Sequence, residues 1–218
     1  MCQLEKDGRT GLWYRPETND LSIIRSQQAE YGKLGDIGDA RIMDIGGHIG
    51  AFAQWALARD ASFIDIYEPA PANLALLCFN MYSENRVSIH SWAIAHINGI
   101  TSFYLARTKD MSSHRLVMTK GRATIDVVCR SLESAVEDIH PSVIKMDIEG
   151  GEYLLQDDFV LLPECVRKIA IEFHFPHRNL AAMQTILGVM NKDWHALREP
   201  KFNEKSWNTV GIWERNLF

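Results

Sequence analysis

Short apolar runs alternate with longer helical patterns from residue 41 onward. Residues 41–45 (RIMDI) and 62–67 (SFIDIY) are compact apolar runs that end at turn residues, as buried strands do. Each run is followed by a segment of good helix formers, at residues 51–58 and 73–82. Strand, helix, strand and helix in succession predict a parallel sheet with helices on both of its faces.

The alternation continues to the end of the chain. Further strands are predicted at residues 86–90, 123–129, 143–148 and 168–175, and a further helix at residues 180–190. Asn98-Gly99 indicates a hairpin-like turn. The last two extended runs, at residues 194–197 and 208–213, are too close together for a helical crossover, so we expect them to pair antiparallel.

No feature of the sequence divides the chain. It has no internal repeat, low-complexity tract or linker, so residues 1–218 are expected to form a single domain. Residues 1–35 are interpreted as an N-terminal lead-in with a helix near residues 21–31. The polar residues 106–122 lack clear periodicity and are expected to form a loop over one end of the sheet, on the substrate side.

Composition narrows the choice of partners. The net charge of -5 over 218 residues gives no basic footprint, so nucleic acid is not expected as a partner. No run approaches the ~20 apolar residues of a membrane span, so no membrane partner is expected. Four cysteines without C-x-x-C spacing and a charged N-terminus favour a cytoplasmic location. The oligomeric state is left open.

A glycine turn is the sharpest local feature. Residues 44–50 (DIGGHIG) lie between the first predicted strand and its helix, where glycines let a ligand approach the main chain. The N-terminus of that helix offers unpaired N–H groups to an anionic group such as a carboxylate. Glu68 ends the second strand, where an acid can accept hydrogen bonds from both ribose hydroxyls. Together these features predict a site for an adenosine ligand.

The spacing of the glycines distinguishes a dinucleotide site from other sites for adenosine ligands. A dinucleotide fingerprint, G-x-G-x-x-G, would need a glycine where His48 stands. The sequence reads D-x-G-x-x-x-G instead, which resembles the first motif of class I S-adenosylmethionine-dependent methyltransferases. An ordinary strand-to-helix glycine turn is the alternative for this motif taken alone, and Glu68 at the expected place counts against it.

Three further segments resemble the FkbM-type methyltransferases. Residues 67–73 (YEPAPAN) are similar to that family's E-P-x-P-x-N signature, residues 145–152 (KMDIEGGE) to its K-x-D-x-E-G-x-E segment, and residues 172–174 (EFH) to its next strand. The likeness runs over roughly residues 15–174. Two positions depart from it, with His48 in place of a frequent Asn and Gly151 in place of a more usual Ala.

The resemblance implies a fold, a cofactor and its contacts. The fold is a Rossmann-like α/β domain whose mostly parallel seven-stranded sheet ends in an antiparallel last strand. The cofactor is S-adenosylmethionine, whose sulfonium cation favours acidic surroundings. Asn73 either contacts the cofactor or braces the Glu68 turn, and Ala93 borders the adenine. The expected cofactor-binding residues are Asp44, Gly46, Gly47, Gly50, Glu68, Asn73, Ala93 and Asp147.

The expected reaction is methyl transfer to a hydroxyl oxygen of a small metabolite, sugar or polyketide. Such an acceptor loses a proton, and His174, Asp147 or Glu149 is expected to take it. The alternative for His174 is a purely structural hydrogen bond. The alternative for Glu149 is that it caps the next helix. The chain also lacks an N-P-P-Y-like segment, which favours oxygen over nitrogen as the acceptor atom.

Three alternatives stay open. Asp147, Glu149, Glu172, His174 and His177 offer metal-binding atoms, but no spacing matches a defined metal motif, so no metal site is predicted and a divalent metal is not favoured. A nicotinamide-dependent oxidoreductase would share the sheet architecture. A non-catalytic nucleoside-binding module acting as a partner protein would share the pocket.

Overall fold

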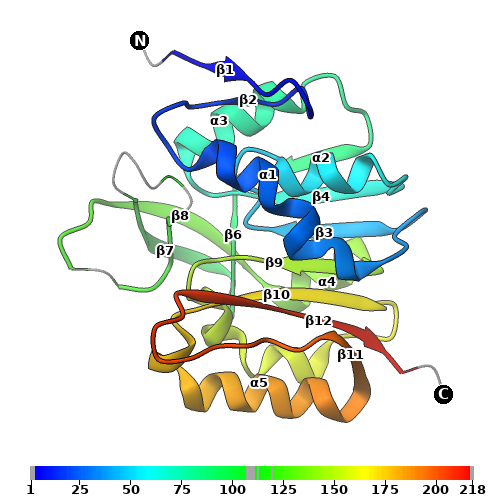
Figure 1. The fold of residues 1–218 in the computed structure, drawn as a ribbon. Helices are drawn as coiled ribbons and strands as arrows, with labels where there is room; N and C mark the ends of the chain where they lie inside the picture. Colours follow the sequence, from blue (N-terminus) through cyan, green and yellow to red (C-terminus); the bar gives the residue numbers. More distant parts are fainter. Residues whose placement is uncertain (1–2, 107–110, 112, 119, 217–218) are drawn as a thin grey trace.

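The computed structural model describes residues 3–106, 111, 113–118 and 120–216. Its larger sheet consists of β3 (Arg41–Ile45), β4 (Phe63–Tyr67), β5 (Val87–His90), β9 (Val143–Met146), β10 (Lys168–His174), β11 (Trp194–Arg198) and β12 (Asn208–Arg215). The strand order is β11-β12-β10-β9-β3-β4-β5 (Figure 1). Strand β12 runs antiparallel to both of its neighbours, and all the other neighbours run parallel. The expected mostly parallel seven-stranded sheet is confirmed.

Helices cover both faces of this sheet, as expected. Successive side chains of a strand point to opposite faces, so Ile42 packs toward one helical layer and Met43 toward the other. One layer contains α1 (Asp20–Tyr31), η1 (Gly32–Leu34), α2 (Ala51–Leu57) and α3 (Pro71–Asn80). The other contains α4 (Leu132–Ile139), η2 (Gly151–Leu155), η3 (Asp158–Leu161) and α5 (Leu180–Asp193). Helix α4 begins where the Ser131 hydroxyl accepts a hydrogen bond from the Ser134 N–H.

A second sheet lies beside the first, at the left of Figure 1. It consists of β6 (Ala93–Ala95), β8 (Thr124–Ser131) and β7 (Gly99–Tyr104), with β8 in the middle. The hairpin expected at Asn98-Gly99 is wrong, because β6 and β7 each pair with β8 rather than with one another. Asn98 accepts a hydrogen bond from the Ser131 N–H at 2.9 Å, which draws the turn toward β8.

The N-terminal lead-in packs on the first helical layer. It holds a two-stranded ribbon, β1 (Glu5–Lys6) and β2 (Trp13–Tyr14), followed by the expected helix α1. Tyr31 at the end of α1 is buried, and its hydroxyl lies 3.4 Å from a carboxylate oxygen of Glu172 in β10. The lead-in therefore reaches the carboxyl end of the large sheet. Across the described residues, none of the helices combines the length and the apolar character that crossing a membrane requires.

Candidate functional site

A cavity of about 540 Å³ opens at the carboxyl ends of β3, β4, β9 and β10, within the size range of small-molecule sites. Helix α1 and the loop before β8 form part of its wall. Of the expected loop, residues 107–110, 112 and 119 lie outside the described residues. The predicted site residues that line the cavity are Gly46, Gly47, Glu68, Asn73, Ala93, Asp147, Glu149 and His174.

The glycine turn at the end of β3 has no room for side chains. Gly46 has a φ of +85°, and a Cβ there would lie 1.8 Å from the main-chain oxygen of Asp147. A Cβ on Gly47 would lie 2.0 Å from Ile66 Cγ2. The N–H groups of both glycines donate to the carbonyl of Tyr67, at 2.9 and 3.0 Å. The turn is thus clamped between β4 and β9, with bare main chain facing the cavity.

Glu68 stands opposite this turn, as expected. One carboxylate oxygen accepts the His48 N–H and the other accepts the Ala70 N–H, both at 2.8 Å. Only 5% of the residue is exposed. Burial raises the pKa of Glu68 to about 7 despite these two hydrogen bonds. Each oxygen has a second lone pair, so the carboxylate retains capacity to accept from a ligand hydroxyl.

A buried polar network joins the lead-in to the turn. Arg15 makes a two-pronged ion pair with Asp20, at 2.8 and 2.9 Å, and also donates to the Asn73 side-chain oxygen at 2.9 Å. His48 Nε2 lies 3.3 Å from Asp20 Oδ1. Although burial opposes ionisation, hydrogen bonds from His48 and Arg15 hold the pKa of Asp20 well below its usual range. Asn73 donates in turn to the Met111 carbonyl at 3.0 Å, so it links three segments of the chain.

Lys145 lies at the floor of the cavity, and Asp44 lies beneath it. The ammonium group donates to the Gly46 carbonyl at 2.8 Å and lies 3.2 Å from Asp44 Oδ1 and 3.6 Å from Asp147 Oδ2. Asp44 was expected to bind the cofactor, but it is fully buried and does not line the cavity. Asp44 lies inside β3, before the strand ends, and its carboxylate is paired with the Lys145 ammonium from the neighbouring strand β9.

Gly50 also lies away from the cavity. It has a φ of +93° and begins α2, and a Cβ there would lie 2.6 Å from Met81 Cε. The glycine therefore allows close packing of α2 against α3 rather than approach of a ligand.

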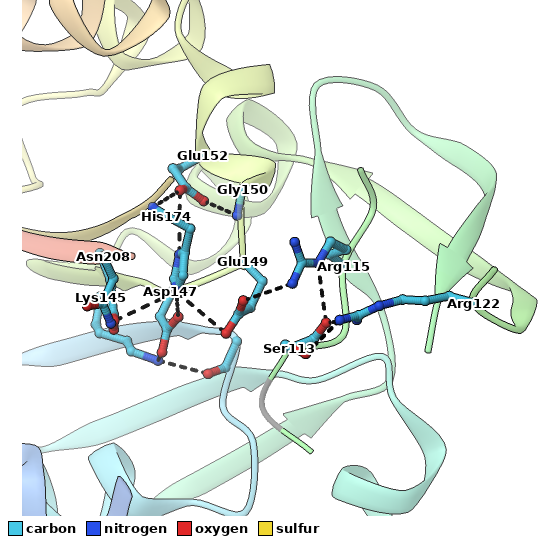
Figure 2. A network of polar contacts seen from close by, with 12 residues as sticks. Ser113, Arg115, Arg122, Lys145, Asp147, Glu149, Gly150, Glu152, His174 and Asn208 are labelled. Atoms are coloured by element: carbon cyan, nitrogen blue, oxygen red, sulfur yellow. Dashed lines mark hydrogen bonds and ion pairs between the residues drawn. The ribbon is translucent and has the colours of Figure 1, made fainter. Parts of the chain in front are cut away.

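Carboxylates converge on His174 at the ends of β9 and β10 (Figure 2). His174 Nε2 lies 3.5 Å from Glu149 Oε1 and 3.7 Å from Asp147 Oδ1. Nδ1 lies 3.5 Å from Glu152 Oε1, and Nε2 lies 3.7 Å from Glu172 Oε1. Desolvation lowers the pKa of His174, but the carboxylates of Glu149, Glu152 and Asp147 outweigh it and hold that pKa well above its usual range. The arrangement therefore accumulates negative charge beside the cavity.

Strained backbone is concentrated at this cavity. His48 (φ +50°), Glu149 (φ +57°) and Phe175 (φ +50°) line it and occupy the left-handed region, which costs energy for residues other than glycine. Gly150, with φ +99°, directly follows Glu149.

Glu152 accepts two main-chain hydrogen bonds beside the cluster. The Gly150 N–H donates to Glu152 Oε2 at 2.8 Å, and the His174 N–H donates to Glu152 Oε1 at 2.6 Å. The fully buried Glu152 thus fixes both sides of the cluster.

Residues 44–198 match the methyltransferase FkbM domain family. The chain belongs to that family. The match covers more than half of the chain and includes the glycine turn, Glu68 and the acidic cluster. Methyl transfer is therefore the activity class of this family member. No curated protein sequence matches it closely enough to count as a relative.

Solved structures share its fold. A putative methyltransferase, yhhF, from Escherichia coli is 12% identical with a TM-score of 0.54, and the match covers 99% of this chain and 100% of that one. A putative S-adenosylmethionine-dependent methyltransferase from Listeria monocytogenes is 8% identical with a TM-score of 0.54, covering 88% and 99%. Magnesium protoporphyrin IX methyltransferase from Synechocystis, solved with bound SAM, is 9% identical with a TM-score of 0.52, covering 97% and 86%. At these identities the likeness concerns the fold.

Three further cavity residues of this methyltransferase were not among the predicted site residues, although Arg115 lies in the loop that was expected on the substrate side. Trp207 is 75% exposed and lines the cavity beside Phe175, with ring centroids 5.6 Å apart. Arg115 lies 3.5 Å from Glu149 and over the Phe175 ring. Arg178 lies over the same ring. The contacts of Trp207 and Arg178 with Phe175 join segments without a periodic pattern, so only the structure shows them.

Proposed function

We propose that the chain transfers the methyl group of S-adenosylmethionine to a hydroxyl oxygen of a small metabolite, such as a sugar or a polyketide. The observation that carries this proposal is the joining of two features in one cavity. A bare glycine turn with Glu68 forms one side, and a cluster of carboxylates with His174 forms the other. The first suits an adenosine ligand, and the second suits a cation and a group that loses a proton.

On the cofactor side, four residues have distinct roles in this proposal. The main chain of Gly46 and Gly47 lies against the cofactor, and Glu68 accepts hydrogen bonds from the ribose hydroxyls. Ala93 borders the adenine, because its small side chain at the cavity wall leaves room for a flat ring. Asn73 positions this side by tying α3 to Arg15.

Asp44 and Gly50 support the cofactor side from behind. Asp44 holds Lys145, whose ammonium fixes the Gly46 carbonyl. Gly50 sets the packing of α2. We therefore assign neither residue a direct cofactor contact.

On the acceptor side, the cluster receives the proton. The hydroxyl oxygen attacks the methyl carbon, the O–CH₃ bond forms as the S–CH₃ bond breaks, and the neutral thioether leaves. Asp147 and Glu149 are the proposed proton acceptors, because their side chains are 29% and 12% exposed and reach the cavity. His174 orients them from a deeper position, with 7% exposure. Holding the oxygen in line with the methyl group can supply ~7–11 kcal/mol of the barrier.

Binding of S-adenosylhomocysteine, measured by isothermal titration, tests the cofactor half. Wild type and the exposed-helix control Glu137→Ala should bind with equal affinity, whereas Glu68→Ala should bind at least tenfold more weakly. Equal affinity of Glu68→Ala and wild type would refute the assignment. Thermal protection by NAD without protection by S-adenosylhomocysteine would favour an oxidoreductase instead.

A metabolite screen with methyl-labelled S-adenosylmethionine tests the acceptor half. Label should appear as an ether on a hydroxylated compound and disappear in the Asp147→Asn and Glu149→Gln variants. Label on nitrogen would contradict an oxygen acceptor. Cofactor binding without turnover on a broad hydroxyl panel would favour a non-catalytic module. The cytoplasmic location and the single-domain organisation of residues 1–218 stay predictions.

A further inference from the structure

The cluster at His174 has the composition and spacing of a cation site. Asp147 and Glu149 follow β9, and His174 ends the neighbouring strand β10 (Figure 2). One ligand atom from each of the three residues lies within 4.8 Å of the other two. Because parallel strands end at the same edge of a sheet, residues 25 positions apart in sequence come together there. No linear spacing motif could reveal such a set.

The distances suit coordination better than direct hydrogen bonding. His174 Nε2 lies 3.5 Å from Glu149 Oε1 and 3.7 Å from Asp147 Oδ1, whereas N–H···O bonds are about 2.7–3.2 Å long. Ligand atoms lie about 2.0–2.6 Å from Mg²⁺ or Ca²⁺, so two ligands at right angles around one ion lie about 3–3.6 Å apart. The 3.5 Å separation falls within that range, and the 3.7 Å separation lies about 0.1 Å above it.

An independent feature directs the imidazole toward the cavity. His174 is more than nine-tenths buried, and its Nδ1 makes no hydrogen bond within the described residues. The fully buried Glu152 stands 3.5 Å behind Nδ1 and is itself fixed by two main-chain N–H groups. A carboxylate behind one ring nitrogen, with the other nitrogen facing the oxygens of Asp147 and Glu149, is the arrangement that supports histidine ligands of metals.

We propose that Asp147, Glu149 and His174 bind a divalent cation, Mn²⁺ or Mg²⁺, whose open positions face the acceptor. The two carboxylates suit these hard ions, and the cluster holds no thiolate. Glu172 lies beside the three proposed ligands, but we do not include it among them. Its Oε1 already accepts a hydrogen bond from Asn208. The strained backbone at Glu149 is consistent with a side chain held in place for binding.

The role of the cation rests on the proposed function. An acceptor hydroxyl bound to the cation would lose its proton more readily and would be fixed in position. Its proton passes to the uncoordinated carboxylate oxygen of Asp147 or Glu149, the proton acceptors of the proposed function, and the acceptor oxygen attacks the methyl carbon as the S–CH₃ bond breaks. The cation would keep its charge and its three protein ligands throughout the step. Only the acceptor bound to it would change.

Binding of Mn²⁺ to the full chain, followed by electron paramagnetic resonance after EDTA treatment, tests the site without any activity. Wild type should bind one Mn²⁺ per chain, and Mg²⁺ should compete for it. Asp147→Asn, Glu149→Gln and His174→Gln should each weaken binding at least tenfold. Glu152→Gln should weaken it about tenfold, as expected for a residue that orients a ligand.

Asp65→Asn is the matched control, because Asp65 is a buried acid that lies 3.1 Å from His90 and does not line the cavity. It should bind Mn²⁺ within twofold of wild type. Near-ultraviolet circular dichroism separates lost binding from lost folding, and His174→Asn serves as a second variant if His174→Gln does not fold. Absence of Mn²⁺ binding to wild type, or binding that survives all three ligand substitutions, would overturn the inference. S-adenosylhomocysteine titration of the same samples reports separately on the proposed function.

Discussion

Glu68 should make the stability of the folded protein depend on pH in a defined direction. Its pKa is about 7 in the folded protein against an ordinary value of 4.5, because burial penalises the carboxylate. A carboxyl whose pKa is higher in the folded state binds more protons there than in the unfolded chain. Its contribution therefore favours folding below pH 4.5 and is lost as pH rises toward 7.

The size of this effect follows from the two pKa values. Between pH 5 and pH 8, ionisation of Glu68 should lower the free energy of unfolding by about 2.5 kcal/mol, taking about 1.36 kcal/mol per pKa unit. Glu68→Gln removes the titration but also leaves an amide N–H₂ facing a main-chain N–H, a penalty that does not vary with pH. The diagnostic quantity is thus the change with pH of the difference between the two proteins.

Urea unfolding of wild type and Glu68→Gln at pH 5, 6, 7 and 8 measures how this difference in unfolding free energy changes with pH. The free energy of unfolding of the variant should gain about 2.5 kcal/mol relative to wild type across this range. The variant should not gain affinity for S-adenosylhomocysteine along with this stability. It should bind S-adenosylhomocysteine weakly at every pH. A difference that stays constant from pH 5 to pH 8 would refute the reasoning on burial of Glu68.

The remaining predictions concern other parts of the fold. Gly46→Ala should lower the free energy of unfolding by more than about 3 kcal/mol, because its Cβ would lie 1.8 Å from the Asp147 main-chain oxygen. Gly188→Ala in α5 is the control, because a Cβ there meets nothing within 4 Å. In the same denaturation assay it should be neutral or stabilising by about 0.5–1 kcal/mol. Ser131→Ala should cost about 1 kcal/mol through loss of the cap of α4, and an unchanged midpoint would count against that cap. Glu149→Gln should lower kcat by about 10²–10⁴-fold while S-adenosylhomocysteine affinity changes less than threefold, and a fall in affinity alone would contradict its catalytic role.

The large sheet was predictable because its strands are short, apolar and separated by helical patterns. Strand β3 has the predicted bounds, and β4, β5 and β10 differ from the predicted bounds by one residue at one end. The second sheet was not predicted, because β6 has three residues and gives no periodic signal. Asn98-Gly99 has the composition of a hairpin turn, but β8, a strand distant in sequence, takes both pairings.

The candidate site was predictable where a residue follows a strand and faces the cavity. Glu68 and Asp147 satisfy that condition, since the carboxyl ends of parallel strands share one edge. Asp44 does not, because it lies inside β3 and its carboxylate is paired with Lys145 below the cavity floor. The contacts of Arg15 with Asn73 cross from the lead-in to α3, and sequence spacing carries no information on them.

The contact between Gly46 and the Asp147 main chain has a consequence for how such a chain can diversify. Because backbone meets backbone there, the distance from the cofactor side to the acidic cluster cannot be altered by exchanging a side chain. Changes in acceptor preference must then come from the outer wall, at α1 and the loop before β8, where side chains such as Arg115 face the cavity. One part of the molecule would stay constant while the other varies, so new acceptors could be accommodated without realigning the methyl group.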